Sequence, residues 1–358
     1  MSEFRGKKAL VGLIAVFLGL VAGGLLMLTS GDNPFAGYGF LFRGGLMNWE
    51  RIGNTLATAT PLIFTGLSVA FAFRTGLFNI GASGQMLMGG FAATAVGITL
   101  QVYWGMNLPQ PVMLLLSLSA ALIAGALWAA VPGFLKALFN VHEVVSTIMM
   151  NWIAYWTVYY LVPAWFKGPF LETESMKIPE AASLKVAWLT DMFSGSYINL
   201  GLFLALAGIL VISFILNKST LGFQLKAVGF NRHGAEYAGI RVNKNIALSM
   251  MIAGALAGLG GATLYTGYAS SIQIGVLPTQ GFDGIAVALL GANSPGGVLL
   301  AALFFGVLHS GKGFMNANTH IPPEIGDTII AVIIYFAAIS ILIEKLLGYL
   351  AAKRKGKV

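Results

Sequence analysis

The stretch GLFNIGASGQMLMGGF, residues 76–91, places Asn79, Ser83 and Gln85 among glycines between two long apolar runs. Each run is long enough for a helix to cross about 30 Å of hydrocarbon, which takes about 20 residues. Non-helical backbone is tolerated at that depth only where it is buried in protein or lines a watery cavity, because unpaired N–H and C=O groups cost several kcal/mol in lipid. The stretch therefore predicts a helical membrane protein with a polar break inside it.

Two interpretations of this break are open. In the first, Asn79, Ser83 and Gln85 line a cavity and meet a polar solute that crosses the membrane. In the second, the glycines allow close helix packing, and the polar side chains form ordinary hydrogen bonds between helices. The first interpretation concerns transport, and the second concerns only the packing of the fold.

The composition extends the membrane assignment to the whole chain. Of 358 residues, 57% are hydrophobic and 9% are charged, and the mean hydropathy is +0.81. A β-barrel is excluded because the apolar runs are continuous and do not alternate. The expected fold is an all-α polytopic membrane protein, a single domain over residues 1–358, with about ten transmembrane helices, some of them short or broken. The expected spans are 9–29, 52–73, 85–104, 112–131, 143–165, 198–216, 246–268, 281–292, 296–310 and 325–347.

The distribution of basic residues predicts the orientation. With both termini cytoplasmic, the cytoplasmic segments carry 15 of the 21 Lys and Arg residues and the outer segments carry six. This agrees with the enrichment of Lys and Arg in cytoplasmic loops. Topology then accounts for the net charge of +8, so no nucleic-acid partner is needed to explain it. The chain contains no cysteine, which excludes disulfides and thiol chemistry.

Two hydrophilic segments separate the expected spans. Segment 166–197 is expected outside, either as a solvated connector or as a surface for an extracellular partner. Segment 217–245 is expected inside, and its apolar positions recur at helical spacing with small residues such as Ala235 and Gly239 on one stripe. Such a helix suits docking into a groove of a soluble partner. The alternative is a helix that lies on anionic lipid through its basic side chains.

A polar stripe enters the membrane from the stretch NVHEVVSTIMMNWIAYW, residues 140–156. Asn140 precedes Glu143 by three residues, which is a variant of the capping box, so Glu143 is expected to cap a helix. Thr147 and Asn151 continue the same helical face. An amide in the middle of a span is either a hydrogen-bonding contact between helices or a ligand for a transported solute, and both remain open for Asn151.

The stretch GFDGIAVALLGANSPGGVLLAALFFG, residues 281–306, contains two short apolar runs interrupted by Gly, Pro and Asn293. Paired short segments of this kind indicate a transport site built by broken helices. Asp283 stands at the start of the first run. If Asp283 lies within the membrane, it is a candidate functional residue, because acids there are rare and costly. If the span begins two residues later, Asp283 is an ordinary residue of the membrane interface.

Motifs for catalysis or metal binding are missing from the sequence. It has no G-x-x-x-x-G-K-[ST] motif, so it lacks a Walker nucleotide site. The histidines lie too far apart for a metal cluster, and no nucleophile has a neighbouring base. We therefore expect no enzyme activity, no metal site and no cofactor bound by this chain.

Four blocks of sequence resemble the permease subunits of bacterial ABC importers in the branched-chain amino acid and simple-sugar superfamily. They are FNIGASGQMLMGG (78–90), HEVVSTIMMNWIA (142–154), AVGFNRHGAEYAGIRV (227–242) and GFDGIAVALLGANSPGG (281–297). The sequence is most similar to the branch that takes up nucleosides such as guanosine. Relatives carry an acid at the position of Ser83, so the resemblance does not extend to solute specificity there.

The resemblance implies a role for each block. The residues that would dock into the ATPase subunit are Asn231, Ala235, Glu236, Tyr237, Ala238, Gly239 and Ile240. The residues that would line the substrate path are Phe78, Asn79, Ser83, Gln85, Asn151, Trp152, Asp283 and Asn293. The implied partners are an ABC ATPase subunit that holds ATP and Mg, a second homologous permease, an extracellular substrate-binding lipoprotein and the lipid bilayer of a bacterial cell membrane.

Other functions remain open at this point. The chain could be a permease for simple sugars or for branched-chain amino acids within the same superfamily. It could also be an ion-coupled secondary transporter in which Asp283 or Glu143 relays protons or binds sodium. The segment 217–245 separates these classes, because a secondary transporter has no need of a docking helix.

Overall fold

The computed structural model describes residues 2–29, 31–169 and 173–339. Within these ranges the chain is helical, and strand-like pairing is limited to isolated β-bridges. The α-helices are α1 (Ser2–Thr29), α2 (Pro34–Leu46), α3 (Trp49–Arg74), α4 (Ala82–Ile98), α5 (Gln110–Phe139), α6 (Glu143–Trp165), α7 (Ala187–Met192), α8 (Gly201–Lys218), α9 (Thr220–Phe230), α10 (Arg232–Tyr237), α11 (Val242–Ala262), α12 (Thr279–Leu290), α13 (Pro295–Asn318) and α14 (Glu324–Ala338). Two π-helices, η1 (Thr99–Tyr103) and η3 (Thr263–Ala269), extend α4 and α11, and η2 (Glu180–Ala182) is a 3-10 turn. The predicted all-α class is confirmed.

Seven helical segments in the described ranges are long and apolar enough to cross a membrane. They are Gly12–Thr29, Trp49–Arg74, Ala82–Tyr103, Gln110–Phe139, Gly201–Lys218, Val242–Ala269 and Pro295–Asn318. The predicted span 143–165 coincides with α6, and 281–292 overlaps the short helix α12. The span 325–347 begins on α14 and extends past residue 339, outside the described residues. The number of ten crossings and the cytoplasmic termini stay predictions.

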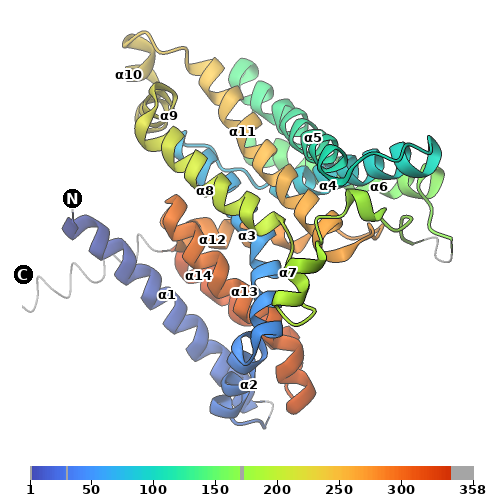
Figure 1. Cartoon of the computed structure of the whole chain (residues 1–358). Helices are drawn as coiled ribbons and strands as arrows, with labels where there is room; N and C mark the ends of the chain where they lie inside the picture. Colours follow the sequence, from blue (N-terminus) through green and yellow to red (C-terminus); the bar gives the residue numbers. More distant parts are fainter. Residues whose placement is uncertain (1, 30, 170–172, 340–358) are drawn as a thin grey trace, which may run out of the picture.

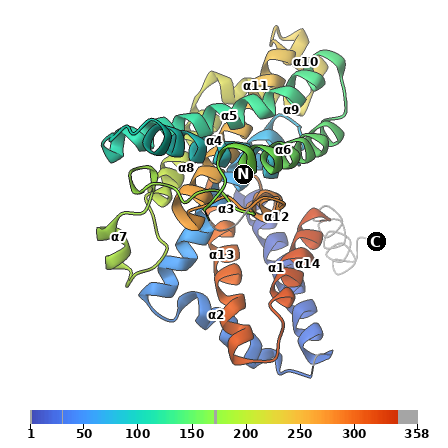
Figure 2. The same ribbon diagram turned by 90° about the vertical axis from the view of Figure 1, so that its right-hand side faces the viewer.

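Helices α3 and α12 lie between two groups of helices (Figure 2). Helices α4, α5, α6 and α11 pack on one side, and α1, α2, α13 and α14 on the other. Helix α3 contacts both α11 and α13. Helices α9 and α10 lie at one end of the molecule, hereafter the α10 end, and α2 lies at the opposite end, hereafter the α2 end (Figure 1). Helix α3 runs from the α2 end to Arg74 at the α10 end.

Glycines hold α4, α5 and α11 in backbone contact. A Cβ atom on Gly258 of α11 would lie well under 3.0 Å from the carbonyl oxygen of Ala121 in α5. A Cβ on Gly261, one turn further, would lie even closer to the carbonyl oxygen of Met86 in α4. Side chains larger than hydrogen are excluded at both positions, as expected where helices associate in lipid through small residues. These three helices therefore form a tightly packed unit.

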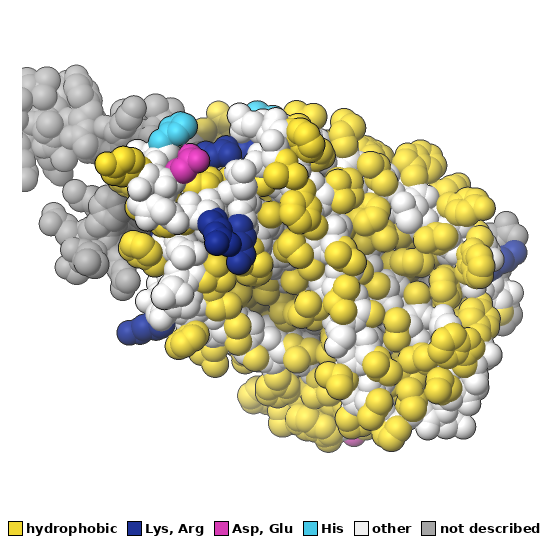
Figure 3. Space-filling model, turned by 90° about the horizontal axis from the view of Figure 1, so that it is seen from above, with side chains coloured by type: hydrophobic (Ala, Val, Ile, Leu, Met, Phe, Trp, Pro, Cys, Tyr) yellow, Lys and Arg dark blue, Asp and Glu magenta, His cyan; other side chains and the backbone are white. Residues whose placement is uncertain are grey.

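The surface of the molecule is predominantly apolar. Figure 3 shows hydrophobic side chains over most of one face, with Lys and Arg gathered at the side where α9 and α10 lie. On α5 and α8, Leu115, Leu127, Leu210 and Phe214 are 60 to 72% exposed. A surface of this kind is stable against lipid and not against water, so it supports the membrane assignment.

Candidate functional site

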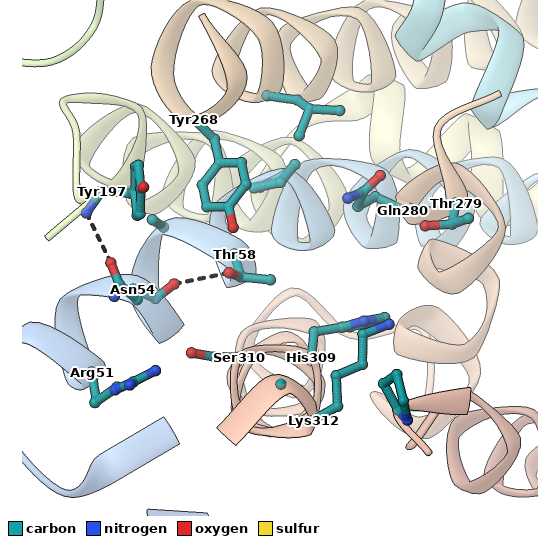
Figure 4. Close-up of a pocket in the computed structure, with 15 residues that line it drawn as sticks. Arg51, Asn54, Thr58, Tyr197, Tyr268, Thr279, Gln280, His309, Ser310 and Lys312 are labelled. Atoms are coloured by element: carbon teal, nitrogen blue, oxygen red, sulfur yellow. Dashed lines mark hydrogen bonds between the residues drawn. The ribbon is translucent and has the colours of Figure 1, made fainter. Parts of the chain in front are cut away.

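A cavity of about 500 Å³ opens among α3, η3, α12 and α13 (Figure 4). It lies in the half of the molecule toward the α2 end, because the α3 residues that line it come from the first half of that helix. Its walls carry amides, hydroxyls, aromatic rings and basic side chains in an otherwise apolar bundle. The lining residues are Arg51, Asn54, Ala57, Thr58, Pro61, Tyr197, Leu264, Tyr268, Thr279, Gln280, His309, Ser310, Lys312, Gly313 and Pro323.

Helix α3 presents one polar stripe to this cavity. Asn54, Thr58 and Pro61 follow one another at helical spacing and therefore share a face. The Asn54 Oδ1 atom accepts a hydrogen bond of 2.9 Å from the backbone N–H of Tyr197, and the Thr58 hydroxyl donates to the Asn54 carbonyl at 2.9 Å (Figure 4). Pro61 has no N–H, so the carbonyl of Ala57, a residue that lines the cavity, lacks its usual helical donor.

An aromatic wall comes from the π-helix η3. Tyr268 lies in the last turn of η3, and its ring centroid lies 5.3 Å from that of Tyr197. Single π-turns within α-helices are frequent at functional sites, because they redirect a side chain. The Lys185 ammonium lies 5.0 Å from the centroid of the Tyr197 ring. Burial lowers the pKa of Lys185 below its ordinary value.

Helix α12 begins at the cavity wall, and it has only 12 residues. Its first residues, Thr279 and Gln280, line the cavity. The Ser83 hydroxyl donates to the Pro278 carbonyl at 2.7 Å, and the Thr65 hydroxyl donates to the Gln280 carbonyl at 2.9 Å. The start of α12 is thus fixed against both α3 and α4. The predicted interruption of the helix in this region is confirmed, and the positive end of a short helix faces the cavity.

Between the cavity and the α10 end, α3 is closed to solvent. Every residue from Leu62 to Ala72 is buried. Polar contacts follow at successive levels along this stretch. The Asn79 amide donates to the Ser68 hydroxyl at 3.4 Å, and the Arg74 guanidinium donates to the Asn293 carbonyl at 2.7 and 3.1 Å. The conformation therefore has a cavity toward the α2 end and closed packing toward the α10 end.

The polar side chains of the stretch 76–91 are buried in this conformation. The amides of Asn79 and Gln85 exchange two hydrogen bonds, of 2.9 and 3.0 Å. The Asn151 Oδ1 atom accepts from the backbone N–H of Gly84 at 2.8 Å, and its Nδ2 atom donates to the Ile80 carbonyl at 3.0 Å. These side chains satisfy the backbone groups that the break leaves unpaired. In this state they join α3, α4 and α6 and do not line the cavity.

The other predicted path residues lie in different places. Phe78 stacks on Phe73, with ring centroids 5.2 Å apart. Trp152 is 51% exposed on the outer face of α6. Asn293 has a left-handed backbone with φ of 52° in the turn between α12 and α13. Asp283 lies directly behind His309, which does line the cavity. The structure thus brings only Asp283 close to the cavity among these four.

The expected capping box at the start of α6 is wrong. Asn140 ends α5 in a left-handed conformation with φ of 53°, and His142 precedes α6 without a capping hydrogen bond from its side chain. Glu143 instead pairs with Lys136 of α5 at 2.9 Å. The tight connection between the two helices needs Asn140 for the turn, so its side chain cannot also cap α6.

The segment 217–245 contains α9 and α10, followed by the start of α11. Asn231 caps α10, because its Oδ1 atom accepts from the backbone N–H of Gly234 at 2.9 Å. Ala235 is buried and Ile240 is half-buried, whereas Glu236, Tyr237, Ala238 and Gly239 are exposed. Gly239 has φ of +79° and ends the helix, so the predicted helical stripe through Gly239 is wrong and a turn takes its place.

None of the residues that line the cavity was among the sequence candidates, and the missed polar and aromatic residues include Asn54, Thr58, Tyr268, Gln280 and His309. The spacing of Asn54 and Thr58 within the span 52–73 was an available signal, since a polar stripe in a buried membrane helix indicates either packing or a cavity. Tyr268 carried no such signal, because its position depends on the π-turn.

A polytopic helical protein with a polar cavity, a short helix beginning at its wall and an amphipathic segment at one end has the architecture of a membrane permease. Comparison with known sequences agrees: residues 51–338 match the family described as branched-chain amino acid transport system / permease component, and the chain belongs to this family. It is a multi-pass protein of the cell membrane.

Relatives cover nearly the whole chain. The guanosine ABC transporter permease protein NupP of Bacillus subtilis is 45% identical over 98% of this chain and 99% of its own length. The nucleoside ABC transporter permease protein NupB of Lactococcus lactis is 40% identical over 96% of this chain and 94% of its own length. The guanosine ABC transporter permease protein NupQ, also of Bacillus subtilis, is 32% identical over 72% of this chain and 79% of its own length.

Proposed function

We propose that this chain is the translocation subunit of an ATP-driven importer for nucleosides and that the cavity on α3, η3, α12 and α13 holds the solute during transport. The cavity is the observation that carries this proposal. A nucleoside presents an aromatic base with donors and acceptors on its edge and a sugar with hydroxyls. Tyr268 and Tyr197 offer rings for stacking, while Asn54, Thr58 and Gln280 offer hydrogen-bonding groups.

The relatives support the nucleoside assignment and the partners. Two of them are named for guanosine or nucleosides at 40 to 45% identity over nearly the full chain. Bacillus subtilis has two different guanosine permeases similar to this chain, which supports pairing with a second, homologous permease. The remaining proposed partners are an ATPase subunit that binds ATP and Mg, and an extracellular lipoprotein that captures the solute. This chain itself would hold no cofactor.

The direct test of this function is uptake by the assembled complex. The chain would be purified with the products of neighbouring genes and reconstituted in proteoliposomes with ATP inside. We expect ATP-dependent uptake of labelled guanosine that an excess of glucose or leucine does not reduce. Uptake of glucose or leucine instead would show that the solute is a sugar or an amino acid and not a nucleoside. Uptake that follows an ion gradient without ATP would establish a secondary transporter.

We propose ten membrane crossings with both termini cytoplasmic, so that the α10 end faces the cytoplasm and segment 166–197 lies outside. The bias of Lys and Arg supports this orientation. A reporter fused after Ser219 is expected to be active on the cytoplasmic side, and one fused after Lys177 on the outer side. Alkaline phosphatase and green fluorescent protein fusions at both sites measure this, and reversal of either result contradicts the topology.

The coupling role of α10 rests on its exposure at the α10 end. Tyr237 is 97% exposed and the neighbouring Phe230 is 94% exposed, although both carry large rings. Exposed aromatic rings beside a short helix suit insertion into a groove of the ATPase subunit. The proposed docking residues are Glu236, Tyr237, Ala238 and Gly239 at the surface, with Asn231, Ala235 and Ile240 shaping the helix beneath them.

Replacing Tyr237 with Asp is expected to uncouple the complex. The substitution removes the exposed ring and adds a charge to the docking surface, so the ATPase should dissociate more readily and uptake should fall at least about tenfold. Co-purification of the ATPase and guanosine uptake measure the effect. The control is Tyr103→Asp, which changes a 52% exposed ring distant from α10. This variant should leave ATPase binding intact. Normal uptake by the Tyr237 variant would refute the docking assignment.

The remaining path residues are proposed to line the route between the cavity and the α10 end after it opens. Asn79, Gln85 and Asn151 are fully paired in the closed conformation and would release these partners to water and solute in the open one. Asn79→Leu alone strands the Gln85 amide, which costs about 1–3 kcal/mol. The double variant Asn79→Leu/Gln85→Leu leaves no unpaired partner in that pair and should recover much of that stability.

Transport by this double variant separates the two interpretations of the polar break. We expect it to assemble and hydrolyse ATP but to transport guanosine poorly, because two leucines cannot hydrogen-bond a passing solute. Thermal stability, basal ATPase activity and uptake are measured on one preparation. Recovery of stability together with normal uptake would show that Asn79 and Gln85 serve packing only.

A further inference from the structure

Asp283 of α12 and His309 of α13 form a buried pair directly behind the cavity wall. The Asp283 Oδ2 atom lies 3.2 Å from the His309 Nε2 atom, and each side chain is 14% exposed. Both of these atoms are closed off from solvent, and neither has a hydrogen-bond partner among the described residues. The His309 ring nevertheless lines the cavity, as Figure 4 shows. The Nε2 edge of the ring therefore faces Asp283, and the accessible part of the ring faces the cavity.

The neighbouring charges leave His309 as the partner of Asp283. Lys312, one turn along α13, pairs with Asp327 at 2.6 Å. Arg51 lies over the Phe314 ring, with its guanidinium carbon 5.2 Å from the ring centroid. Within the described ranges no Lys or Arg lies within ion-pair distance of Asp283. A buried carboxylate needs a donor, and His309 Nε2 is the side-chain nitrogen at ion-pair distance that can supply it, although its N–H is not aligned for a hydrogen bond in this conformation.

This pairing fixes the hydrogen-bonding character of the other ring nitrogen. A neutral imidazole has one N–H donor and one lone-pair acceptor. A carboxylate at Nε2 holds the proton on Nε2, so Nδ1 is the acceptor. Within the described residues Nδ1 has no hydrogen-bond partner, and unlike Nε2 it is not closed off from solvent. The ring therefore offers an acceptor to whatever occupies the cavity.

We infer that His309 selects the transported solute by accepting a hydrogen bond from it and that Asp283 is the positioning residue that sets this acceptor. This inference rests on the proposed function. Guanine, hypoxanthine and uracil carry a ring N–H on their pairing edge, whereas adenine and cytosine carry a bare ring nitrogen at the corresponding position. An acceptor on the wall favours the first class, because two facing lone pairs leave both acceptors buried without a donor.

Asp283→Asn and His309→Gln test the two roles with little change in volume. An Asn side chain offers either an oxygen or an N–H to Nε2, so both forms of the ring become accessible and selection is lost. A Gln at position 309 likewise offers either a donor or an acceptor to the solute. The double variant should behave like each single variant, because both act on one hydrogen bond. Asp327→Asn is the control, since it removes a carboxylate that lies near the cavity but pairs with Lys312.

The first measurement is competitive binding to the complex with its ATPase and second permease in nanodiscs, without the lipoprotein. We expect guanosine to bind at least about tenfold tighter than adenosine to the wild type and to the Asp327 variant, as one well-placed hydrogen bond predicts. The preference should disappear in the Asp283, His309 and double variants. An unchanged preference in the Asp283 and His309 variants would overturn the inference, as would equal weakening of both nucleosides.

The second measurement is the ¹⁵N spectrum of labelled histidine, with the His309 signals assigned from His309→Gln. We expect a protonated Nε2 and a bare Nδ1 in the wild type, a mixture in Asp283→Asn, and a shift of Nδ1 when guanosine is added. A protonated Nδ1 in the neutral wild-type ring would refute the inference.

If the complex binds glucose or leucine and no nucleoside, the proposed nucleoside function is wrong, but the role of His309 can still be tested. The shift of Nδ1 on adding that solute then decides the role of His309. A shift that Asp283→Asn alters supports the role, and no shift overturns it.

Discussion

Replacing Gly261 with alanine is expected to abolish assembly of the transporter, although the change adds a single methyl group. That methyl carbon would lie closer to the Met86 carbonyl oxygen than Cβ atoms come to other atoms in proteins. Helices α11 and α4 would therefore have to separate. Backbone atoms cannot turn aside as a flexible side chain can, and overpacking of this kind costs about 1–3 kcal/mol or more. The measurement is the yield and thermal stability of the purified complex.

The matched control is Gly39→Ala on α2. Gly39 is also helical, but a Cβ there meets nothing within 4 Å. This variant should express, assemble and transport like the wild type. Equal stability of the two variants would mean that α4 and α11 are not in backbone contact, and the tight unit of α4, α5 and α11 would have to be abandoned.

Tyr268→Ala is expected to remove most nucleoside uptake while leaving the complex assembled. The ring forms the aromatic wall of the cavity and is 39% exposed, and the Thr58 hydroxyl beside it keeps its hydrogen bond to the Asn54 carbonyl, so we expect the bundle to stay packed without the ring. Stacking of a base on an aromatic ring contributes about 1–3 kcal/mol, which corresponds to about 5- to 150-fold in binding. Uptake of guanosine and basal ATPase activity are measured on the same proteoliposomes.

Tyr268→Phe separates the ring from its hydroxyl. The ring alone supports stacking, so this variant should retain most of the uptake that the alanine variant loses. Uptake that falls equally in both variants would assign the role to the hydroxyl and contradict stacking. Uptake that stays normal in Tyr268→Ala would remove this cavity from the transport route.

The sequence was informative where one local pattern had one structural outcome. The Gly and Pro residues around Asn293 predicted an interrupted helix, and α12 is indeed short. The apolar runs predicted where the long helices lie, although α5 and α13 each continue eight residues past the predicted ends at 131 and 310. The polar stretch at Asn79 and Gln85 predicted hydrogen bonding inside the membrane, and the structure shows that bonding between the two amides.

The sequence was not informative where the outcome depended on contacts between distant segments. Glu143 matched a local cap but pairs with Lys136, because α5 and α6 are brought together by the turn at Asn140. The helix expected through Gly239 ends earlier, because that glycine adopts a backbone that stops it. The cavity combines residues from α3 with others more than 200 positions later, and no pattern within either segment indicates that they meet.

The buried stretch of α3 from Leu62 to Ala72 bears on how the cell keeps its membrane potential. A permease spends much of its life waiting for solute, and an aqueous channel left open during that time would conduct ions down their gradients. The polar groups in this closely packed stretch, the Thr65 and Ser68 hydroxyls, are hydrogen-bonded to other parts of the protein and do not replace the water of hydrated ions. We therefore expect a complex in this conformation to be impermeable to ions, so that many copies can reside in one membrane without discharging the potential that drives other transport.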